Sequence, residues 1–260
     1  MGSRRFLIVQ TGMLRDVAPA EIDPLGDFDQ MIIAAGGFAA GETQTVKVCA
    51  GAPLLEEPNA FRGILITGSS SMVGRPEPWM DELTKWLRRA IEQRTSVLGI
   101  CFGHQLIAHV LGGTVAPNPN GCELGTVSLT FTEAWRGDPL FGNLPQGAKV
   151  QVHHYESVAS LPRGARVLAS NGHEPHQVVR YARNIWGVQF HPELNADVMR
   201  ELIASDAPKL ASEGVDVEKV LASIADSSSG NLILRRFREL ADTLGDVQGS
   251  FGAPGQRHYL

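Results

Sequence analysis

The sequence predicts an α/β fold in which a mostly parallel central sheet is flanked by helices and followed by a C-terminal helical extension. Strand-like apolar runs alternate with helical patterns through most of the 260 residues, which is typical of such sheets. The run Ser96-Val97-Leu98-Gly99-Ile100 leads through Cys101 directly into a helical stretch. Beyond Ala204 only helical patterns follow, and this change predicts the extension.

The first half of the chain supplies four expected strands and three expected helices. Strands are expected over residues 6–10, 45–49, 63–67 and 97–100, and helices over 27–35, 77–91 and 104–111. In the second helix Trp79, Leu83, Trp86, Leu87 and Ala90 recur at helical spacing. That stripe predicts a face packed on the core. Gly112-Gly113 is expected to end the third helix.

The second half is rich in strands and ends in helices. Strands are expected over 123–132, 149–152 and 166–169, a hairpin over 177–181 and 185–190, and helices over 196–204, 215–225 and 231–244. These patterns suggest a main domain over 1–205, a helical extension over 206–245 and a loose Gly/Pro-rich tail over 246–260. The last helix carries an apolar face that packs either on the core or on another chain, and its residues are Leu232, Leu234, Phe237, Leu240 and Leu244.

The turn Gly99-Ile100-Cys101-Phe102-Gly103 contains a candidate nucleophile. A glycine on either side of the corner allows a sharp, partly strained turn between strand and helix. A thiol at a helix N-terminus faces unpaired N–H groups and the positive end of the helix dipole, which stabilises its thiolate. We therefore expect Cys101 to be exposed at the sheet edge as a nucleophile rather than buried as a structural thiol.

A nucleophile needs a base, and the run from Trp186 to Glu193 offers one. An alternating apolar strand ends there in His191, and Pro192 breaks the strand pairing before Glu193. An imidazole can take the thiol proton, and a carboxylate behind it can fix its tautomer. Cys101, His191 and Glu193 are therefore the predicted catalytic set.

Together, Gly99-Ile-Cys-Phe-Gly-His-Gln105 and Gln189-Phe-His-Pro-Glu193 resemble the motifs of the class I, or triad, glutamine amidotransferases. The resemblance covers roughly residues 5–205, and this segment is similar to the amidotransferase part of GMP synthase. It implies a flavodoxin-like fold and cleavage of a glutamine side-chain amide through a thioester.

The resemblance also implies the rest of the site. The turn after the 63–67 strand resembles half of the family's oxyanion hole, which implies that the N–H groups near Gly68 and Ser69 act with that of Phe102. Gln105 matches a position that contacts glutamine, and 121–127 resembles the segment bordering the glutamine pocket. The 152–158 stretch resembles a substrate-binding loop, which implies contacts at His154 and Tyr155, although Tyr155 and Glu156 stand where Gly and Asp are commoner.

Composition points to an intracellular enzyme. The net charge of −5 is spread without a basic run, so no nucleic-acid partner is expected. Three sparse cysteines, with no Cys/His cluster at zinc spacing, suit a reducing compartment and predict no metal site. The apolar run at 6–9 is too short for a signal peptide or a membrane span. A cytoplasmic protein is expected, and the thioester mechanism needs no cofactor.

Three functions remain open from the sequence. The chain could be a glutaminase-type amidotransferase whose ammonia serves a separate synthase, because neither a pyrophosphatase loop nor a Walker-type phosphate loop is present. It could instead be a stand-alone hydrolase of γ-glutamyl peptides or conjugates. It could also be a non-catalytic interaction protein with a relic site, which the intact catalytic set disfavours.

Overall fold

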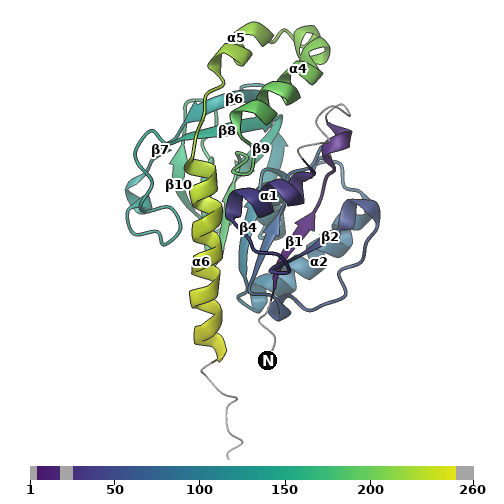
Figure 1. Cartoon of the computed structure of the whole chain (residues 1–260), viewed down its shortest axis with the longest axis vertical. Coiled ribbons are helices and arrows are strands. Elements are labelled where there is room, and N and C mark those ends of the chain that lie inside the picture. The colour runs from purple at the N-terminus through teal and green to yellow at the C-terminus, as the bar shows by residue number, and fades with distance from the viewer. Residues whose placement is uncertain (1–4, 18–25, 250–260) are drawn as a thin grey trace, which may run out of the picture.

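The computed structural model describes residues 5–17 and 26–249 and has a central sheet of eight strands (Figure 1). Their order across the sheet is β2-β1-β3-β4-β12-β11-β10-β7. In that order the strands are Thr43–Lys47, Phe6–Gln10, Gly63–Ile66, Ser96–Ile100, Ile185–Val188, Val178–Ala182, Arg166–Ser170 and Thr130–Phe131. The first five pair in parallel and the last three are added antiparallel. The predicted mostly parallel sheet with flanking helices is confirmed.

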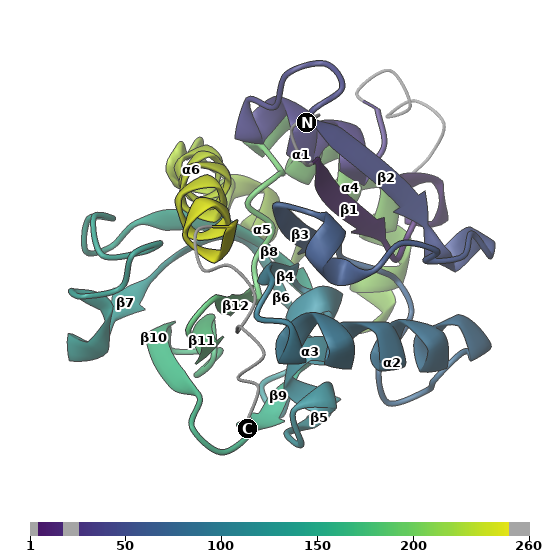
Figure 2. The same ribbon diagram turned by 90° about the horizontal axis from the view of Figure 1, so that it is seen from below.

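Helices cover both faces of the sheet. Helices α2 (Pro78–Glu92) and α3 (Phe102–Val110) lie together on one face, whereas α1 (Phe28–Gly36) and the long α6 (Ser229–Gly249) lie on the other (Figure 2). Strands β1, β3 and β4 are buried throughout, because helices cover them on both sides.

Local sequence explains two of these helices. Asp27 caps α1 by accepting the N–H of Phe28, and Gln30 completes a capping box. Gly37 ends α1 in the left-handed conformation, with φ 64°. In α2 the predicted stripe faces the core, where Leu83, Trp86, Leu87 and Ala90 are buried and Trp79 is partly buried.

Two small sheets stand apart from the central sheet and correct the sequence prediction. The expected strand 123–132 is broken into β6 (Glu123–Ser128) and β7, which belong to different sheets. Strand β6 pairs with β8 (Lys149–His154). Strands β5 (Thr114–Pro117) and β9 (Glu156–Ser160) pair with each other and were not predicted. Their pairing joins segments about 40 residues apart, which no local pattern reveals.

Two other boundaries differ from expectation. Strand β2 begins and ends two residues earlier than predicted, because Val48–Ala50 forms a 3-10 turn. Helix α4 (Ala196–Ser212) continues eight residues past the expected end. It contains Pro208, and a proline normally favours ending a helix before it. The proposed domain boundary at 205/206 therefore falls inside α4.

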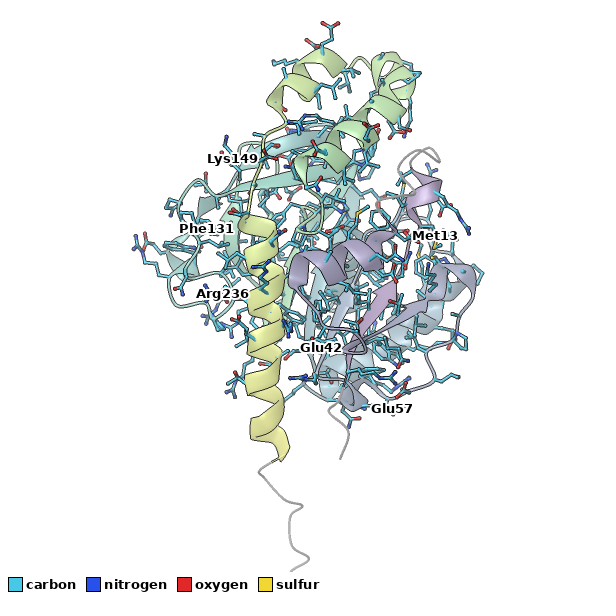
Figure 3. All side chains as sticks on the ribbon, viewed as in Figure 1. Met13, Glu42, Glu57, Phe131, Lys149 and Arg236 are labelled. Atoms are coloured by element: carbon cyan, nitrogen blue, oxygen red, sulfur yellow. The ribbon has the colours of Figure 1, made fainter. Side chains whose placement is uncertain are left out.

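The C-terminal helices pack on the rest of the chain. Helix α5 (Val217–Ser223) contacts α4 and β6, and α6 contacts α1 most extensively. Ser227 donates to the carbonyl of Lys149 before α6 begins. Arg236 and Arg238 of α6 donate to the carbonyl of Pro139, at 2.9 Å, and to Glu42, at 2.8 Å; Lys149, Arg236 and Glu42 are labelled in Figure 3.

On the apolar face of α6, the predicted residues Leu234 and Phe237 are buried together with Ile233 and Ala241, whereas the predicted Leu232 is 41% exposed. Of the two partners expected for this face, the core of the same chain is therefore the one observed. Residues 246–249 of the expected tail belong to α6, and residues 250–260 lie outside the described part. Within the described ranges no helix has both the length and the apolar character needed to cross a membrane.

Candidate active site

Cys101 sits at the corner between β4 and α3 in a strained conformation. Its φ is 49° and its ψ is −101°, a region that residues with a side chain rarely occupy. The backbone holds it there from both directions, since its N–H donates to Val188 at 2.8 Å and its carbonyl accepts the N–H of Gln105 at 3.1 Å. The thiol thus lies at the carboxyl end of the parallel strands. Cys101 is nevertheless buried, with 6% of its surface exposed, so the prediction of an exposed thiol is wrong.

Gly99 and Gly103 were predicted to allow a strained turn, but they have another role in the structure. The strain falls on Cys101, because neither Gly99 nor Gly103 has a positive φ. Both glycines are needed for close approach instead. A Cβ on Gly99 would lie 2.5 Å from the Gly103 carbonyl, and one on Gly103 would lie 2.5 Å from the carbonyl oxygen of Ile66. Helix α3 can therefore approach the sheet only with glycine at both positions.

His191 and Glu193 form a buried pair beside Cys101. His191 Nδ1 lies 2.8 Å from Glu193 Oε1, and the Cys101 side chain lies near enough to interact electrostatically with the imidazole. Burial alone would lower the pKa of His191, but the charges of Glu193 and Cys101 outweigh it and raise that pKa well above its usual value. This arrangement can hold an imidazolium next to a thiolate.

The position of His191 follows from the sheet. Strands β12 and β4 pair in register, with Val188 opposite Ile100, so the residues that follow each strand emerge side by side. The N–H of His191 donates to Gln151 at 2.8 Å, and its ring stacks on Phe28 with centroids 6.5 Å apart. The imidazole is thereby fixed from the backbone and from the ring face.

The predicted oxyanion segment lies next to His191. The hydroxyls of Thr11 and Thr67 both donate to the carbonyl of Gly68, at 3.1 and 2.9 Å, and Ser69 Oγ donates to the carbonyl of Thr11 at 2.6 Å. A Cβ on Gly68 would lie 2.7 Å from His191 Cε1. Phe102 is the first residue of α3, so its N–H is one of those that a helix leaves unpaired.

A pocket of about 150 Å³ opens onto Cys101. Its other walls are residues 69–72 after β3, Gln105 of α3, residues 153–156 between β8 and β9, and Asp206 and Lys209 of α4. The predicted residues Ser69, Gln105, His154 and Tyr155 all line it. Asp206 and Lys209 were not predicted as site residues, because α4 was expected to end at residue 204.

Gln105 is held at the base of this pocket. Its side-chain nitrogen donates to the carbonyl of Glu156 at 2.8 Å and to the side-chain oxygen of Gln189 at 3.1 Å. Gln189 in turn donates to Cys101 Sγ at 3.5 Å. Gln189 was not predicted as a site residue, although a polar side chain inside an otherwise apolar strand end was a usable signal.

His154 supports the pocket wall from behind. Its ring nitrogens bond to Glu123 Oε2 at 2.8 Å and to the carbonyl of Glu156 at 3.0 Å, so its polar atoms are engaged within the protein. Glu123 also accepts from Asn171 at 2.6 Å and from Gln177 at 2.7 Å. Glu123 was not predicted, since its partners lie 31 to 54 residues away.

The expected loop at 152–158 is a tight junction between two strands. Strand β8 ends at His154 and β9 begins at Glu156, which leaves Tyr155 between them. Burial, followed by the nearby Glu213 carboxylate, raises the pKa of Tyr155 above its usual value. The carbonyl of His153 lies 3.9 Å from Cys101 Sγ, so this junction reaches the nucleophile through its backbone.

Comparison with known proteins places the chain in a family. The class I glutamine amidotransferase family matches residues 22–207, which is most of the chain. The chain therefore belongs to the class I glutamine amidotransferases, as its motifs predicted. Among solved structures, a glutamine amidotransferase from Thermotoga maritima has a TM-score of 0.72 at 18% identity, covering 93% of this chain and 99% of that one. This likeness shows the fold.

Curated relatives carry two kinds of name. The chain is 30% identical over 145 residues to γ-glutamyl peptidase 5 of Arabidopsis thaliana, covering 55% of this chain and 58% of that protein. It is 29% identical over 194 residues to a glutamine-hydrolysing GMP synthase of Porphyromonas gingivalis, covering 74% of this chain and 35% of that protein. The chain spans less than two thirds of the length of the first curated relatives it matches.

Proposed function

We propose that this protein hydrolyses the side-chain amide of glutamine through a thioester on Cys101 and releases ammonia. One observation carries the proposal. A strained cysteine at a strand–helix corner lies beside a buried His191–Glu193 pair and lines a pocket. A charged imidazole beside a thiol, with helix N–H groups nearby, suits nucleophilic attack on an uncharged carbonyl.

The first half-reaction forms the thioester. The Cys101 thiolate attacks the γ-carbonyl carbon, and the carbonyl electron pair moves to oxygen. The N–H groups of Phe102 and of the Gly68–Ser69 segment stabilise the oxyanion, a contribution of about 3 to 4 kcal/mol for each donor. Protonated His191 gives its proton to the amide nitrogen as the C–N bond breaks, and ammonia leaves.

The second half-reaction restores the enzyme. Neutral His191 takes a proton from water, and the hydroxide adds to the thioester carbonyl. The C–S bond then breaks, glutamate leaves, and the thiolate faces an imidazolium again. Glu193 stays charged throughout, because its role is to orient His191 and stabilise its proton. Glutamine and water thus give glutamate and ammonia.

The fate of the ammonia is part of the proposal. Members of this family named as GMP synthases join the amidotransferase to a synthase, and the chain is similar to the amidotransferase portion. A separate ATP-using synthase would then accept the ammonia. A reducing compartment such as the cytoplasm suits the reaction, because a thiol nucleophile must stay unoxidised.

A second candidate is hydrolysis of γ-glutamyl peptides or conjugates. The similarity to γ-glutamyl peptidase 5 favours it. The same thiolate attacks the same γ-carbonyl, and the leaving group is an amine rather than ammonia. The two candidates therefore differ only in the space and contacts on the leaving-group side of Cys101.

The test measures ammonia release from L-glutamine beside amine release from γ-glutamyl dipeptides. Cys101→Ala should lower either activity by about 10⁴-fold or more, whereas Cys49→Ala, which removes another free thiol, should not. Glutamine turnover supports the first candidate and peptide cleavage alone supports the second. Wild-type protein inactive on both, also with added synthase, would leave the non-catalytic alternative.

A further inference from the structure

Helix α4 brings two opposite charges to the same pocket as the nucleophile. Asp206 and Lys209 both line the pocket that contains Cys101. They are three residues apart in α4, so their side chains lie on one face of the helix. The match to the family ends at residue 207, so Asp206 lies at the end of the shared segment and Lys209 lies two positions beyond it.

Each charge is held against the junction between β8 and β9. Asp206 Oδ2 lies 3.6 Å from His153 Nε2, and this contact with the His153 ring lowers the pKa of Asp206, so this carboxyl is ionised at neutral pH. Lys209 Nζ lies 4.5 Å from the centroid of the Tyr155 ring, a cation–π contact that fixes the ammonium at the pocket wall.

The chemistry of the reaction determines which end of the substrate these charges face. His191 must protonate the departing nitrogen, so the leaving group lies on the side of His191, next to Gly68 and Phe28. The acyl chain attached to Cys101 must then extend the other way. The pocket, which Asp206 and Lys209 line and His191 does not, offers the space for it.

A free glutamyl group ends in an ammonium and a carboxylate on one carbon. A carboxylate and an ammonium three residues apart on a helix face complement such a zwitterion. We propose that Asp206 binds the α-ammonium, and Lys209 the α-carboxylate, of the glutamyl part of the substrate. This inference rests on the proposed function and makes both residues determinants of specificity. The enzyme then selects glutamine or γ-glutamyl compounds with both α-groups free, and rejects glutamine within a peptide chain.

The test pairs each side chain with the substrate group it binds. Ammonia release is measured as kcat/KM for L-glutamine, its methyl ester and Nα-acetyl-L-glutamine, using wild type, Lys209→Met and Asp206→Asn. Lys209→Met should lower kcat/KM for glutamine about 10-fold, the size expected for a lost charged hydrogen bond, and leave that for the methyl ester nearly unchanged. Asp206→Asn should lower kcat/KM for glutamine and leave kcat/KM for Nα-acetyl-L-glutamine nearly unchanged.

The controls separate recognition from folding. Lys209→Arg should keep most of the preference for glutamine over its methyl ester, because the positive charge is retained. Lys219→Met, on the exposed face of α5, should keep this preference in full. If Lys209→Met lowers kcat/KM equally for glutamine and its ester, the inference is wrong while the proposed function stands. Wild-type protein that hydrolyses no glutamine or γ-glutamyl compound would overturn both.

Discussion

The two sides of the pocket are built by different parts of the fold. On the nucleophile side, Cys101 and His191 follow the neighbouring parallel strands β4 and β12, whose backbones pair in register. On the amino-acid side, residues 153–156 join two separate two-stranded sheets, and α4 supplies the remaining wall. One side is held by the main chain of the central sheet, and the other by side chains at its periphery.

This difference bears on how such an enzyme can change. The nucleophile side depends on close backbone approach, such as that of Gly103 to Ile66, and tolerates little substitution. The amino-acid side depends on a few side-chain bonds, chiefly those of Glu123 to His154 and Gln177. Substitutions there can alter recognition while the chemistry is kept. The comparison predicts large losses of turnover on one side and changes of affinity on the other.

The largest expected effect is that of Glu193→Gln on the nucleophile side. The amide can still accept from His191 Nδ1, but the charge is lost, so we expect kcat to fall about 10³- to 10⁴-fold. The pKa of His191 should then fall, because the charge of Glu193 no longer offsets burial. Stopped assays of ammonia release measure the first effect. Loss of affinity with kcat unchanged would contradict the proposed role.

The same variant gives a pH dependence with a defined sign. In the wild type the raised pKa of His191 contributes stability fully below the unfolded value of about 6.5. That contribution is lost as the pH rises through the folded pKa. Without the Glu193 charge, this loss of stability with rising pH should disappear. NMR titration of His191 and urea unfolding from pH 6 to 9 would measure this difference in pH dependence. Parallel curves of stability against pH for the wild type and Glu193→Gln would count against it.

The next effect is on stability, through the packing of α3. Gly103→Ala would place a Cβ 2.5 Å from a backbone oxygen that cannot rotate away, and we expect a loss of about 3 kcal/mol in the free energy of unfolding. Urea denaturation measures it. Gly137→Ala is the matched control, since nothing lies within 4 Å of its Cβ. Equal effects of the two changes would argue against the packing account.

The sequence predicted the nucleophile side well because its signals are local. The corner at Cys101 and the strand end at His191 are each contained in fewer than ten residues. Their side-by-side placement follows once both are recognised as parallel strand ends. The sequence could not show that Cys101 itself has the positive φ. Flanking glycines usually suggest that a glycine, rather than the residue between them, adopts the strained conformation.

The amino-acid side was predicted poorly because its contacts are distant in sequence. The pairing of β5 with β9 and the bonds of Glu123 join segments 30 to 55 residues apart, and neither leaves a periodic pattern. Helix α4 was predicted to end at Ala204, where the sequence pattern changes, but it continues through Pro208 to Ser212, and Leu210 beyond the proline is fully buried. Asp206 and Lys209 were missed for that reason alone.

A smaller effect is expected when the support of the amino-acid side is weakened. Glu123→Gln turns an amide N–H₂ toward donors from His154 and Gln177. The lost hydrogen bonds should lower the free energy of unfolding by about 2 kcal/mol. The change should also raise KM more than it lowers kcat. Kinetics and urea unfolding at pH 7 test this. The exposed Glu218→Gln is the control, and a fall in kcat with KM unchanged would contradict the assignment.

The pKa of Glu123 gives this prediction a pH signature. Burial raises that pKa, but the hydrogen bonds from His154 and Asn171 outweigh it, so the folded value is lowered. Its stabilising contribution is therefore present above the unfolded pKa of about 4.3 and is lost as the pH falls through the folded value. The stability difference between wild type and Glu123→Gln should shrink below about pH 4. A constant difference down to pH 3 would rule this out.

The smallest effect concerns a surface contact of the nucleophile side. Glu77 accepts from Ser71, at 2.6 Å, and from Trp79 Nε1, at 3.0 Å, and Ser71 lines the pocket. Because these side chains are exposed or only partly buried, Glu77→Gln should change stability by less than about 0.5 kcal/mol and raise KM by about 2-fold.

The matched control for Glu77→Gln is Glu82→Gln, an exposed residue that forms an ion pair with Lys85, and this change should leave glutamine hydrolysis unchanged. A loss of 10-fold or more in kcat with Glu77→Gln alone, about 1.4 kcal/mol, would mean that a surface side chain holds the 69–72 segment in its active position. The nucleophile side would then depend on peripheral contacts as the amino-acid side does, because the backbone of the central sheet would not suffice to position the oxyanion donors.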